Sequence, residues 1–227
     1  MDHIRDEDMP FRAKLLSLTD GETLEWMARK STEFIRLMSY YRCAMMETET
    51  KLNVLNEEYR LQHDRKPINS IQTRLKSPPS IQDKLARKGY PLSMDTIEHQ
   101  LNDVAGIRVV CSFPKDVYTI ADALLAQDDV TLLQWKDYIQ NPKENGYRSL
   151  HLIISVPIFL TNEKREMKVE VQLRTIAMDS WASLEHQLRY KKDREFTAEM
   201  EAKLAHCARL SAELDYYMDD LMKGIQS

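Results

Sequence analysis

Residues 168–174 read KVEVQLR, and apolar and polar side chains alternate along them without interruption. Alternation with a period of two predicts a β-strand, because successive side chains point to opposite faces. The apolar face carries two valines and a leucine, whereas the opposite face carries Glu170, Gln172 and Arg174. At the edge of a sheet this polar face would simply be solvated. In a central strand, the same row would form the floor of a binding site.

The segments on either side predict an α/β domain. Besides Met167–Arg174, strands are predicted at Val104–Phe113, Val130–Trp135 and Leu150–Pro157. Helices are predicted at Ser80–Lys88, Met94–Leu101, Val117–Gln127 and Thr175–Tyr190. Only a short turn-like segment joins the last two strands, which favours an antiparallel pair. We therefore expect a mixed sheet with helices against it.

Long helices are predicted at both ends of the chain. An apolar residue recurs every three or four positions over Phe34–Tyr59, within a stretch from Glu22 to Lys66 that ends at Pro67. A second such seam, Met200–Leu221, predicts a helix that stops at Gly224. Each seam needs a partner, which is either the domain's own sheet or another subunit.

The composition narrows the class of protein. The 227 residues are 43% hydrophobic and 30% charged, which excludes a disordered tail and a membrane protein. Residues 1–20 are polar and aperiodic, so we expect them to be poorly ordered and see no signal peptide there. The three cysteines form no close pair, which argues against a disulfide framework and indicates a reducing, cytoplasmic environment.

Basic residues concentrate in one part of an acidic chain. The formal net charge is −4, yet Arg60–Tyr90 contains eight basic and two acidic residues. The mildly acidic overall charge argues against a protein that coats DNA. The basic segment indicates a local anion site, or else a solvated basic face.

Two other segments have polar residues where a strand begins. Asp103 precedes a predicted strand that contains Gly106, and glycine in a strand often marks a close approach of backbone or ligand. Asp103 is either a metal ligand or an ordinary turn residue. In the loop before the Leu150 strand, an Asn-Gly turn precedes Tyr147, whose ring either stacks on a base or lies free on the surface.

Five segments in this order resemble the synthetase domain of RelA/SpoT-type alarmone enzymes. They are TRLKSPPSIQDKLARKG, NDVAGIRVVC, KENGYRSLH, VEVQLRT and MDSWASLEHQLRYK, within residues 74–192 or directly beside them. We expect neither the hydrolase domain nor the regulatory domains of the long members, because 227 residues leave no room for them. The chain therefore resembles a small, single-domain alarmone synthetase of the RelP/RelQ kind.

The resemblance implies a nucleotidyltransferase-like fold with a mixed five-stranded sheet. It implies transfer of pyrophosphate from ATP to the 3′-hydroxyl of GDP or GTP, which releases AMP and makes (p)ppGpp, the signal of the stringent response. It also implies Mg²⁺ and a homotetramer. We expect a helical region at 21–66, the synthetase domain at 67–192 and an oligomerisation helix at 193–227. Membranes and DNA are not expected partners, and RNA stays open.

The resemblance also implies roles for single residues. Asp103 and Glu170 stand at the metal positions, and Glu170 could alternatively be the base that takes the 3′-hydroxyl proton. The implied ATP-binding residues are Arg74 and Arg108, which would flank adenine, and Lys76, Ser80, Lys84 and Arg87 along the phosphates. The implied GDP- or GTP-binding residues are Tyr147, which would stack on guanine, and Lys143, Asn145, His151, Gln172 and Arg174.

One position departs from the family pattern, and two other functions stay open. Arg148 stands where long members often have glutamine, so we expect a polar contact with an unknown target. The acceptor could instead be an adenine nucleotide or the 3′ end of tRNA, although the acidic remainder argues against tRNA. The chain could also be a non-catalytic nucleotide- or RNA-binding oligomer.

Overall fold

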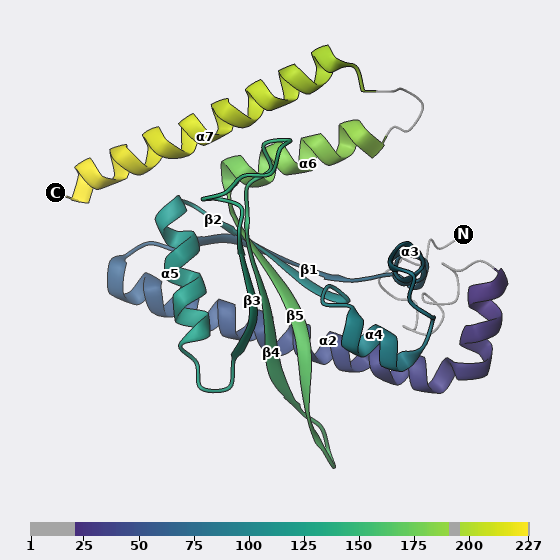
Figure 1. Cartoon of the computed structure of the whole chain (residues 1–227). Coiled ribbons are helices and arrows are strands. Elements are labelled where there is room, and N and C mark those ends of the chain that lie inside the picture. Colours follow the sequence, from purple (N-terminus) through teal and green to yellow (C-terminus); the bar gives the residue numbers. More distant parts are fainter. Residues whose placement is uncertain (1–20, 191–195, 227) are drawn as a thin grey trace, which may run out of the picture.

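A mixed sheet of five strands forms the centre of the computed structural model, which describes residues 21–190 and 196–226 (Figure 1). The strands are β1 (Ile68–Leu75), β2 (Ala105–Cys111), β3 (Thr131–Asp137), β4 (Leu150–Phe159) and β5 (Lys164–Thr175). Their order across the sheet is β1-β2-β5-β4-β3. β2 and β5 run parallel, and the other neighbouring pairs are antiparallel. The predicted mixed sheet is therefore confirmed, with the KVEVQLR segment in its central strand.

Six described helices surround the sheet. They are α2 (Gly21–His63), α3 (Pro78–Lys88), α4 (Met94–Gln100), α5 (Pro114–Leu125), α6 (Ile176–Tyr190) and α7 (Ala198–Gln226). Each predicted helix is present within a few residues of its expected bounds. The prediction that the last helix stops at Gly224 was wrong, because α7 continues to Gln226. A glycine inside a helix costs only about 1 kcal/mol relative to alanine, so it does not by itself end one.

The first apolar seam packs on the protein's own sheet. α2 crosses one face of the sheet (Figure 1) and contacts β1, β2, β4 and β5. The seam residues from Phe34 to Leu52 are buried, and so are Leu37 and Ala44 beside them. Of the two partners considered for this seam, the sheet is therefore the correct one. The buried face is wider than the seam alone, because Leu37 and Ala44 add a second row of contacts.

The two last helices pair with each other at the end of β5. α6 and α7 run antiparallel side by side (Figure 1). Trp181 and Ala182 of α6 are buried against Leu204 and Ala208 of α7. The Trp181 Nε1 donates to the backbone oxygen of Leu204 at 3.2 Å. The first half of the second apolar seam therefore has its partner within the chain.

Some expectations concern parts that the structure does not describe. Residues 1–20 and the boundary expected at 192–193 lie outside the described ranges. Over the ranges that are described, every helix is too short or too polar to span a membrane.

Candidate active site

The strand register brings polar side chains from four strands onto one face of the sheet. Pairing across the sheet aligns one row of Gln72, Arg108, Gln172 and His151, and a second row of Arg74, Gly106 and Glu170. Side chains of directly paired residues point to the same face. The polar face of the central strand is thus continued on both sides, and the interpretation of KVEVQLR as the floor of a site agrees with this arrangement.

A pocket of about 370 Å³ lies over these rows, lined by residues that include Arg74, Lys76, Asp103 and Glu170. Gly106 lies between Arg74 and Glu170 in its row. A Cβ added there would meet the backbone oxygen of Arg74 at 3.5 Å, an ordinary contact. The backbone does not demand glycine at this position. Because Gly106 lines the pocket, its missing side chain instead leaves room above the sheet.

Asp103 lies just before β2 and is bound by two lysines. Lys76 Nζ donates to Asp103 Oδ2 at 2.9 Å, and Lys84 Nζ of α3 lies 2.6 Å from the same oxygen. Burial acts to raise the pKa of Asp103, but the hydrogen bonds from Lys84 and Lys76 outweigh it and lower the pKa below its ordinary value. The other oxygen, Oδ1, is buried and has no hydrogen-bond partner among the described residues. An ionised carboxylate with one unused oxygen is suited to a cation.

Glu170 is the second carboxylate of the pocket. Gln172 Nε2 donates to its Oε2 at 3.0 Å, and His151 Nδ1 lies 3.4 Å from its Oε1. Burial acts to raise the pKa of Glu170, but the interactions with His151 and Gln172 lower it below its ordinary value. The charge of Asp103 opposes this lowering. The two carboxylates therefore interact electrostatically across the pocket.

These two residues fit a magnesium ion. Among the described residues, no three His, Cys, Asp or Glu side chains gather closely enough to hold a metal by themselves. Mg²⁺ does not need such a cage, since it typically binds one or two carboxylates and takes its other ligands from phosphates and water. Asp103, with its unpartnered Oδ1, and Glu170 provide that minimal set.

Tyr147, His151 and Arg174 form one hydrogen-bonded group beside Glu170. The Tyr147 hydroxyl lies 2.9 Å from His151 Nε2 and accepts from Arg174 Nη2 at 2.6 Å. Arg174 also donates to Gln172 Oε1 at 3.1 Å. Lys143 Nζ lies 4.9 Å from the centre of the Tyr147 ring. The structure thus brings together Tyr147, His151, Arg174, Gln172 and Lys143, which the resemblance assigned to the acceptor.

The loop that carries Tyr147 is held by contacts inside the protein. Asn145 Oδ1 accepts from the Tyr147 backbone N–H at 3.2 Å, and Asn145 Nδ2 donates to Glu185 of α6 at 3.3 Å. Arg148 Nη1 donates to Asp215 Oδ2 of α7 at 3.3 Å. This is the target that the sequence did not reveal for Arg148.

Apart from Lys76 and Lys84, which bind Asp103, the residues assigned to ATP lie in three different settings. Arg74 and Arg108 are on neighbouring strands of the same face, where Arg74 is exposed and Arg108 has a buried Nε with no partner among the described residues. The Ser80 hydroxyl lies 2.9 Å from that of Ser77, the residue that caps α3. Arg87 is exposed in the last turn of α3, and its Nε donates to the Asp83 backbone oxygen. Arg87 does not line the pocket.

Sequence reasoning missed several residues here. Asp179 of α6 accepts from Arg174 Nη1 at 3.1 Å and lies 3.5 Å from Arg108 Nη1, so it fixes two arginines of the site. Gln72 lines the pocket from β1, a strand that was not predicted. The segment INSIQTRL carries no clear strand signal, because its apolar residues Ile68, Ile71 and Leu75 are three and four positions apart. Asp179 carried a weak signal, as an acid in the first turn of a helix directly after β5.

Comparisons with known proteins agree with this arrangement. Residues 73–195 match the family described as "Region found in RelA / SpoT proteins". The GTP pyrophosphokinase YwaC of Bacillus subtilis is 41% identical over 82% of this chain and 87% of its own length. The GTP pyrophosphokinase YjbM of the same organism is 33% identical over 84% and 89%.

Solved structures are similar over the same range. Small alarmone synthetase 1 from Bacillus subtilis, bound to its product pppGpp, superposes with a TM-score of 0.78 at 33% identity, over 86% of this chain and 99% of that one. Small alarmone synthetase 2 from the same organism gives a TM-score of 0.75 at 40% identity, over 82% and 97%. The family match and the large share of both chains that these similarities cover lead to one assignment. The chain belongs to the RelA/SpoT family, within its group of small alarmone synthetases.

Proposed function

We propose that this protein transfers pyrophosphate from ATP to the 3′-hydroxyl of GDP or GTP and releases AMP. The observation that carries the proposal is the pair Asp103 and Glu170, held in one pocket between the arginines of β1 and β2 and the Tyr147 group. The relatives support the same reaction, because two of them are named GTP pyrophosphokinases and one was solved with pppGpp.

The reaction requires little covalent chemistry from the protein. The 3′-oxygen of the acceptor attacks the β-phosphorus of ATP, the bond between this phosphorus and the oxygen on the α-phosphate breaks, and AMP leaves. Such transfers depend on in-line positioning and on neutralisation of the phosphate charge. Lys76, Lys84 and Arg108 are the cations beside the two carboxylates. We assign them to the ATP phosphates and base.

Asp103 and Glu170 would hold Mg²⁺, which when bound neutralises phosphate charge. The lowered pKa of Glu170 favours this role over that of a general base, because a carboxylate with a low pKa accepts a proton weakly. In this assignment the proton of the 3′-hydroxyl leaves to water or phosphate as the new bond forms.

The two nucleotides would lie on opposite sides of the carboxylates. On the ATP side, adenine stacks against Arg74 and Arg108, as a planar guanidinium allows. Ser80 and Arg87 are assigned to the ATP side only because they lie on α3, the helix that carries Lys84. On the acceptor side, guanine stacks on Tyr147, and the remaining polar contacts come from Lys143, Asn145, His151, Gln172 and Arg174. Asn145 acts there by shaping the loop, since its observed contacts are within the protein.

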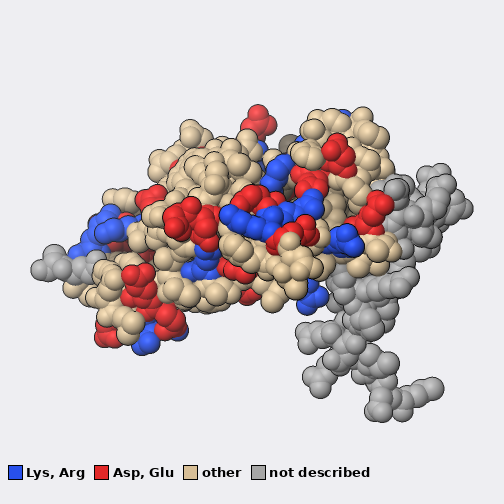
Figure 2. All heavy atoms as spheres, turned by 90° about the horizontal axis from the view of Figure 1, so that it is seen from below, with Lys and Arg blue, Asp and Glu red and all other residues tan. Residues whose placement is uncertain are grey.

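The charge distribution supports a nucleotide acceptor over tRNA. On the face that Figure 2 shows, acidic and basic side chains of the described residues are interleaved, and Lys and Arg form no broad continuous field there. A large polyanion binds through an extended basic surface, whereas a nucleotide needs a few cations in one pocket.

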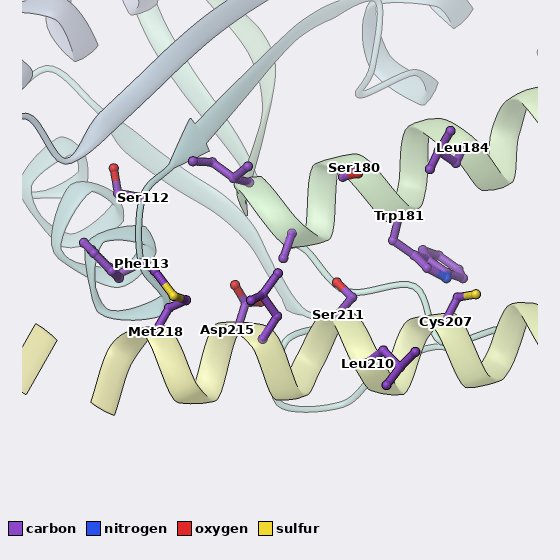
Figure 3. A pocket seen from close by; sticks show the side chains of 13 residues that line it. Ser112, Phe113, Ser180, Trp181, Leu184, Cys207, Leu210, Ser211, Asp215 and Met218 are labelled. Carbon is purple, nitrogen blue, oxygen red and sulfur yellow. The ribbon is translucent and has the colours of Figure 1, made fainter. Parts of the chain in front are cut away.

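We further propose that the protein assembles as a homotetramer through α7 and acts in the cytoplasm, where its nucleotide substrates are found. Apolar side chains line a groove of about 610 Å³ between α6, α7 and the segment before α5 (Figure 3), and they include Phe113, Leu184, Leu210 and Met218. Exposed apolar area of this kind commonly marks a protein interface. The self-complementary occupant of such a surface is a second copy of the chain.

Incubation of the purified protein with ATP labelled in its γ-phosphate tests the function directly. Separate reactions contain GDP, GTP, ADP or tRNA, and the products are separated by thin-layer chromatography. We expect labelled tetra- or pentaphosphate with GDP or GTP and release of AMP. Label transferred to ADP or tRNA but not to the guanine nucleotides would contradict the proposed acceptor. No transfer to any acceptor would contradict the enzyme assignment.

A further inference from the structure

Asp215 is a buried carboxylate on α7, outside all five segments that resemble the family. Only 5% of this residue is exposed. Figure 3 shows its side chain pointing from α7 toward the start of α6. A buried charge is costly unless it is paired, so its partners indicate what the residue does.

A single oxygen of Asp215 joins two elements of the site. Its Oδ2 accepts from Arg148 Nη1 at 3.3 Å and from Thr175 Oγ1 at 2.9 Å. Arg148 belongs to the loop that carries Tyr147, whereas Thr175 is the last residue of β5. The Thr175 hydroxyl also accepts from the Met178 backbone N–H at 3.1 Å and so caps the start of α6.

Both partners of Asp215 are chain neighbours of the acceptor group. Arg148 follows Tyr147 directly, and Thr175 follows Arg174 directly. Arg174 Nη2 donates to the Tyr147 hydroxyl at 2.6 Å, which makes this pair the centre of the group. Asp215 therefore ties together the two backbone segments from which the pair projects.

A second contact of α7 lies on the same loop. Gly146 has a φ of +88°, and a Cβ added there would meet the Ala208 Cβ at 2.4 Å. Helix and loop backbone are thus packed as closely as a glycine permits. The loop touches α7 on both sides of Tyr147, through Gly146 before it and Arg148 after it.

A charge on Asp215 does not stabilise the folded protein. Burial raises the pKa of Asp215, even though the Thr175 hydrogen bond and the charge of Arg148 act to lower it. Ionisation is therefore less favourable here than in the unfolded chain. A neutral residue of the same shape would avoid that cost and keep the bond to Thr175.

We propose that Asp215 is a positioning residue, which fixes the Tyr147 loop on α7 and thereby sets the affinity for the guanine-nucleotide acceptor but not for ATP. This inference rests on the proposed function, in which Tyr147 stacks on guanine. It gives the C-terminal helix a part in substrate binding within its own subunit.

Steady-state kinetics of Asp215→Asn against each substrate tests the proposal. We expect the KM for GDP to rise about tenfold, as loss of one charge-assisted hydrogen bond predicts. The KM for ATP should stay within about twofold, because the residues assigned to ATP lie on β1, β2 and α3 or between them, and not on the loop that Asp215 holds. Asp220→Asn, an exposed aspartate on the same helix, is the matched control and should change neither constant.

A second pair of measurements keeps the test decisive. Arg148→Gln, which removes the charge from the loop, should raise the KM for GDP to a similar extent. The double variant should be no worse than either single variant, because both remove the same contact. If Asp215→Asn does not fold, Arg148→Gln alone carries the test. Calorimetric titration of each protein with GDP checks binding without turnover.

These experiments distinguish a failure of the proposed function from a failure of the positioning role. An unmodified protein that neither binds GDP nor makes labelled product would contradict the proposed function itself. An active unmodified protein whose variants keep the KM for GDP, or weaken GDP and ATP equally, would overturn the positioning role and leave the proposed function intact.

Discussion

Asp103 shows how a single residue can be prepared for a cation before any ligand arrives. Two lysines share its Oδ2, while Oδ1 is buried without a partner among the described residues. The lysines keep the carboxyl ionised despite its burial, and they leave one oxygen for a further positive charge. Removal of the carboxylate would therefore disturb both the proposed magnesium position and two partly buried cations.

Asp103→Asn and Glu170→Gln should each lower synthesis by at least about 100-fold, because each removes a charge that faces the transferred group. Asp103→Asn should also lower the melting temperature more, since Lys76 and Lys84 lose their shared partner. Product formation and thermal melts measure the two effects. Asp83→Asn, an exposed residue of α3, is the control. Residual turnover above about 1% would mean that the carboxylate is wrongly assigned.

Tyr147 contributes both a ring and a hydroxyl. Tyr147→Ala should weaken acceptor binding by roughly 1–3 kcal/mol, the usual contribution of base stacking. The sequence predicted a much milder effect for Tyr147→Phe. From the structure we expect Tyr147→Phe to weaken acceptor binding by about 1 kcal/mol, because the hydrogen bonds of the hydroxyl to His151 and Arg174 would be lost. The KM for GDP measures both changes. Unaltered binding in Tyr147→Phe would show that those two bonds do not position the ring.

Asp215 makes the stability of the protein depend on pH in a defined direction. Its pKa in the folded state is raised above the ordinary 3.8, so its contribution to stability is complete below that value and is lost as the pH rises through the raised pKa. Burial is the main cause of the raised pKa; the Thr175 hydrogen bond and the charge of Arg148 oppose it, and the charge of Asp219 adds to it. Urea unfolding at fixed protein concentration should therefore show the unmodified protein gaining stability relative to Asp215→Asn between pH 7 and pH 4. A constant difference across this range would contradict the burial of a charged group.

Among single residues, those on one strand were predictable and those joined by distant contacts were not. That Glu170, Gln172 and Arg174 share one face follows from the period of a strand alone. The contact of Arg148 with Asp215 spans 67 residues of sequence, and no local pattern encodes such a pair. Asp179 was equally hidden, since its function depends on how α6 leaves the end of β5.

At the scale of elements, β1 and α2 show why patterns mislead. β1 lies at the edge of the sheet and lacks apolar alternation, so the basic residues within and around it dominated the interpretation. The seam of α2 has one apolar residue per turn, and the sequence left its partner open between the sheet and another subunit. Leu37 and Ala44 widen it, and a wider apolar face suits a sheet.

The contact between the Tyr147 loop and α7 can be tested by swapping the glycine and the alanine that meet there, Gly146 and Ala208. Gly146→Ala should destabilise the protein by about 1–3 kcal/mol and raise the KM for GDP, because its Cβ overlaps that of Ala208 and its φ is positive. Adding Ala208→Gly removes the overlap, and the next atom is then Trp181 Cζ2 at 3.9 Å. Thermal melts and kinetics should show partial rescue in the double variant.

Rescue should be incomplete, since the left-handed backbone of Gly146 still costs an alanine roughly 1 kcal/mol. Ala208→Gly alone provides the control for the loss of a helical alanine. If the double variant is worse than the sum of its parts, the helix and the loop are not in the contact that the structure shows.

At the scale of the whole molecule, α7 divides into two parts. Its first half packs on α6 through Leu204 and Ala208. Its second half exposes Leu214 and Leu221 with 53% and 62% of their surface accessible. Both halves belong to one apolar seam in the sequence, so the pattern could not show where the intramolecular partner ends. A charge placed at Leu204 would therefore damage the fold itself, and a test of assembly must use the exposed half.

Light scattering on the unmodified chain and on Leu214→Asp/Leu221→Asp should decide whether this exposed half is an interface. We expect a mass near four times 26.7 kDa for the unmodified protein at micromolar concentration. The variant should fall to a lower mass, because burying an unpaired charge in an interface costs several kcal/mol. Its melting temperature, extrapolated to low protein concentration, should match that of the unmodified protein, since neither leucine is buried within the subunit. Glu213→Gln, an exposed change on the same turn of α7, is the control for a harmless substitution. A mass near 27 kDa for the unmodified protein would contradict assembly, and an unchanged mass in the variant would place the interface elsewhere.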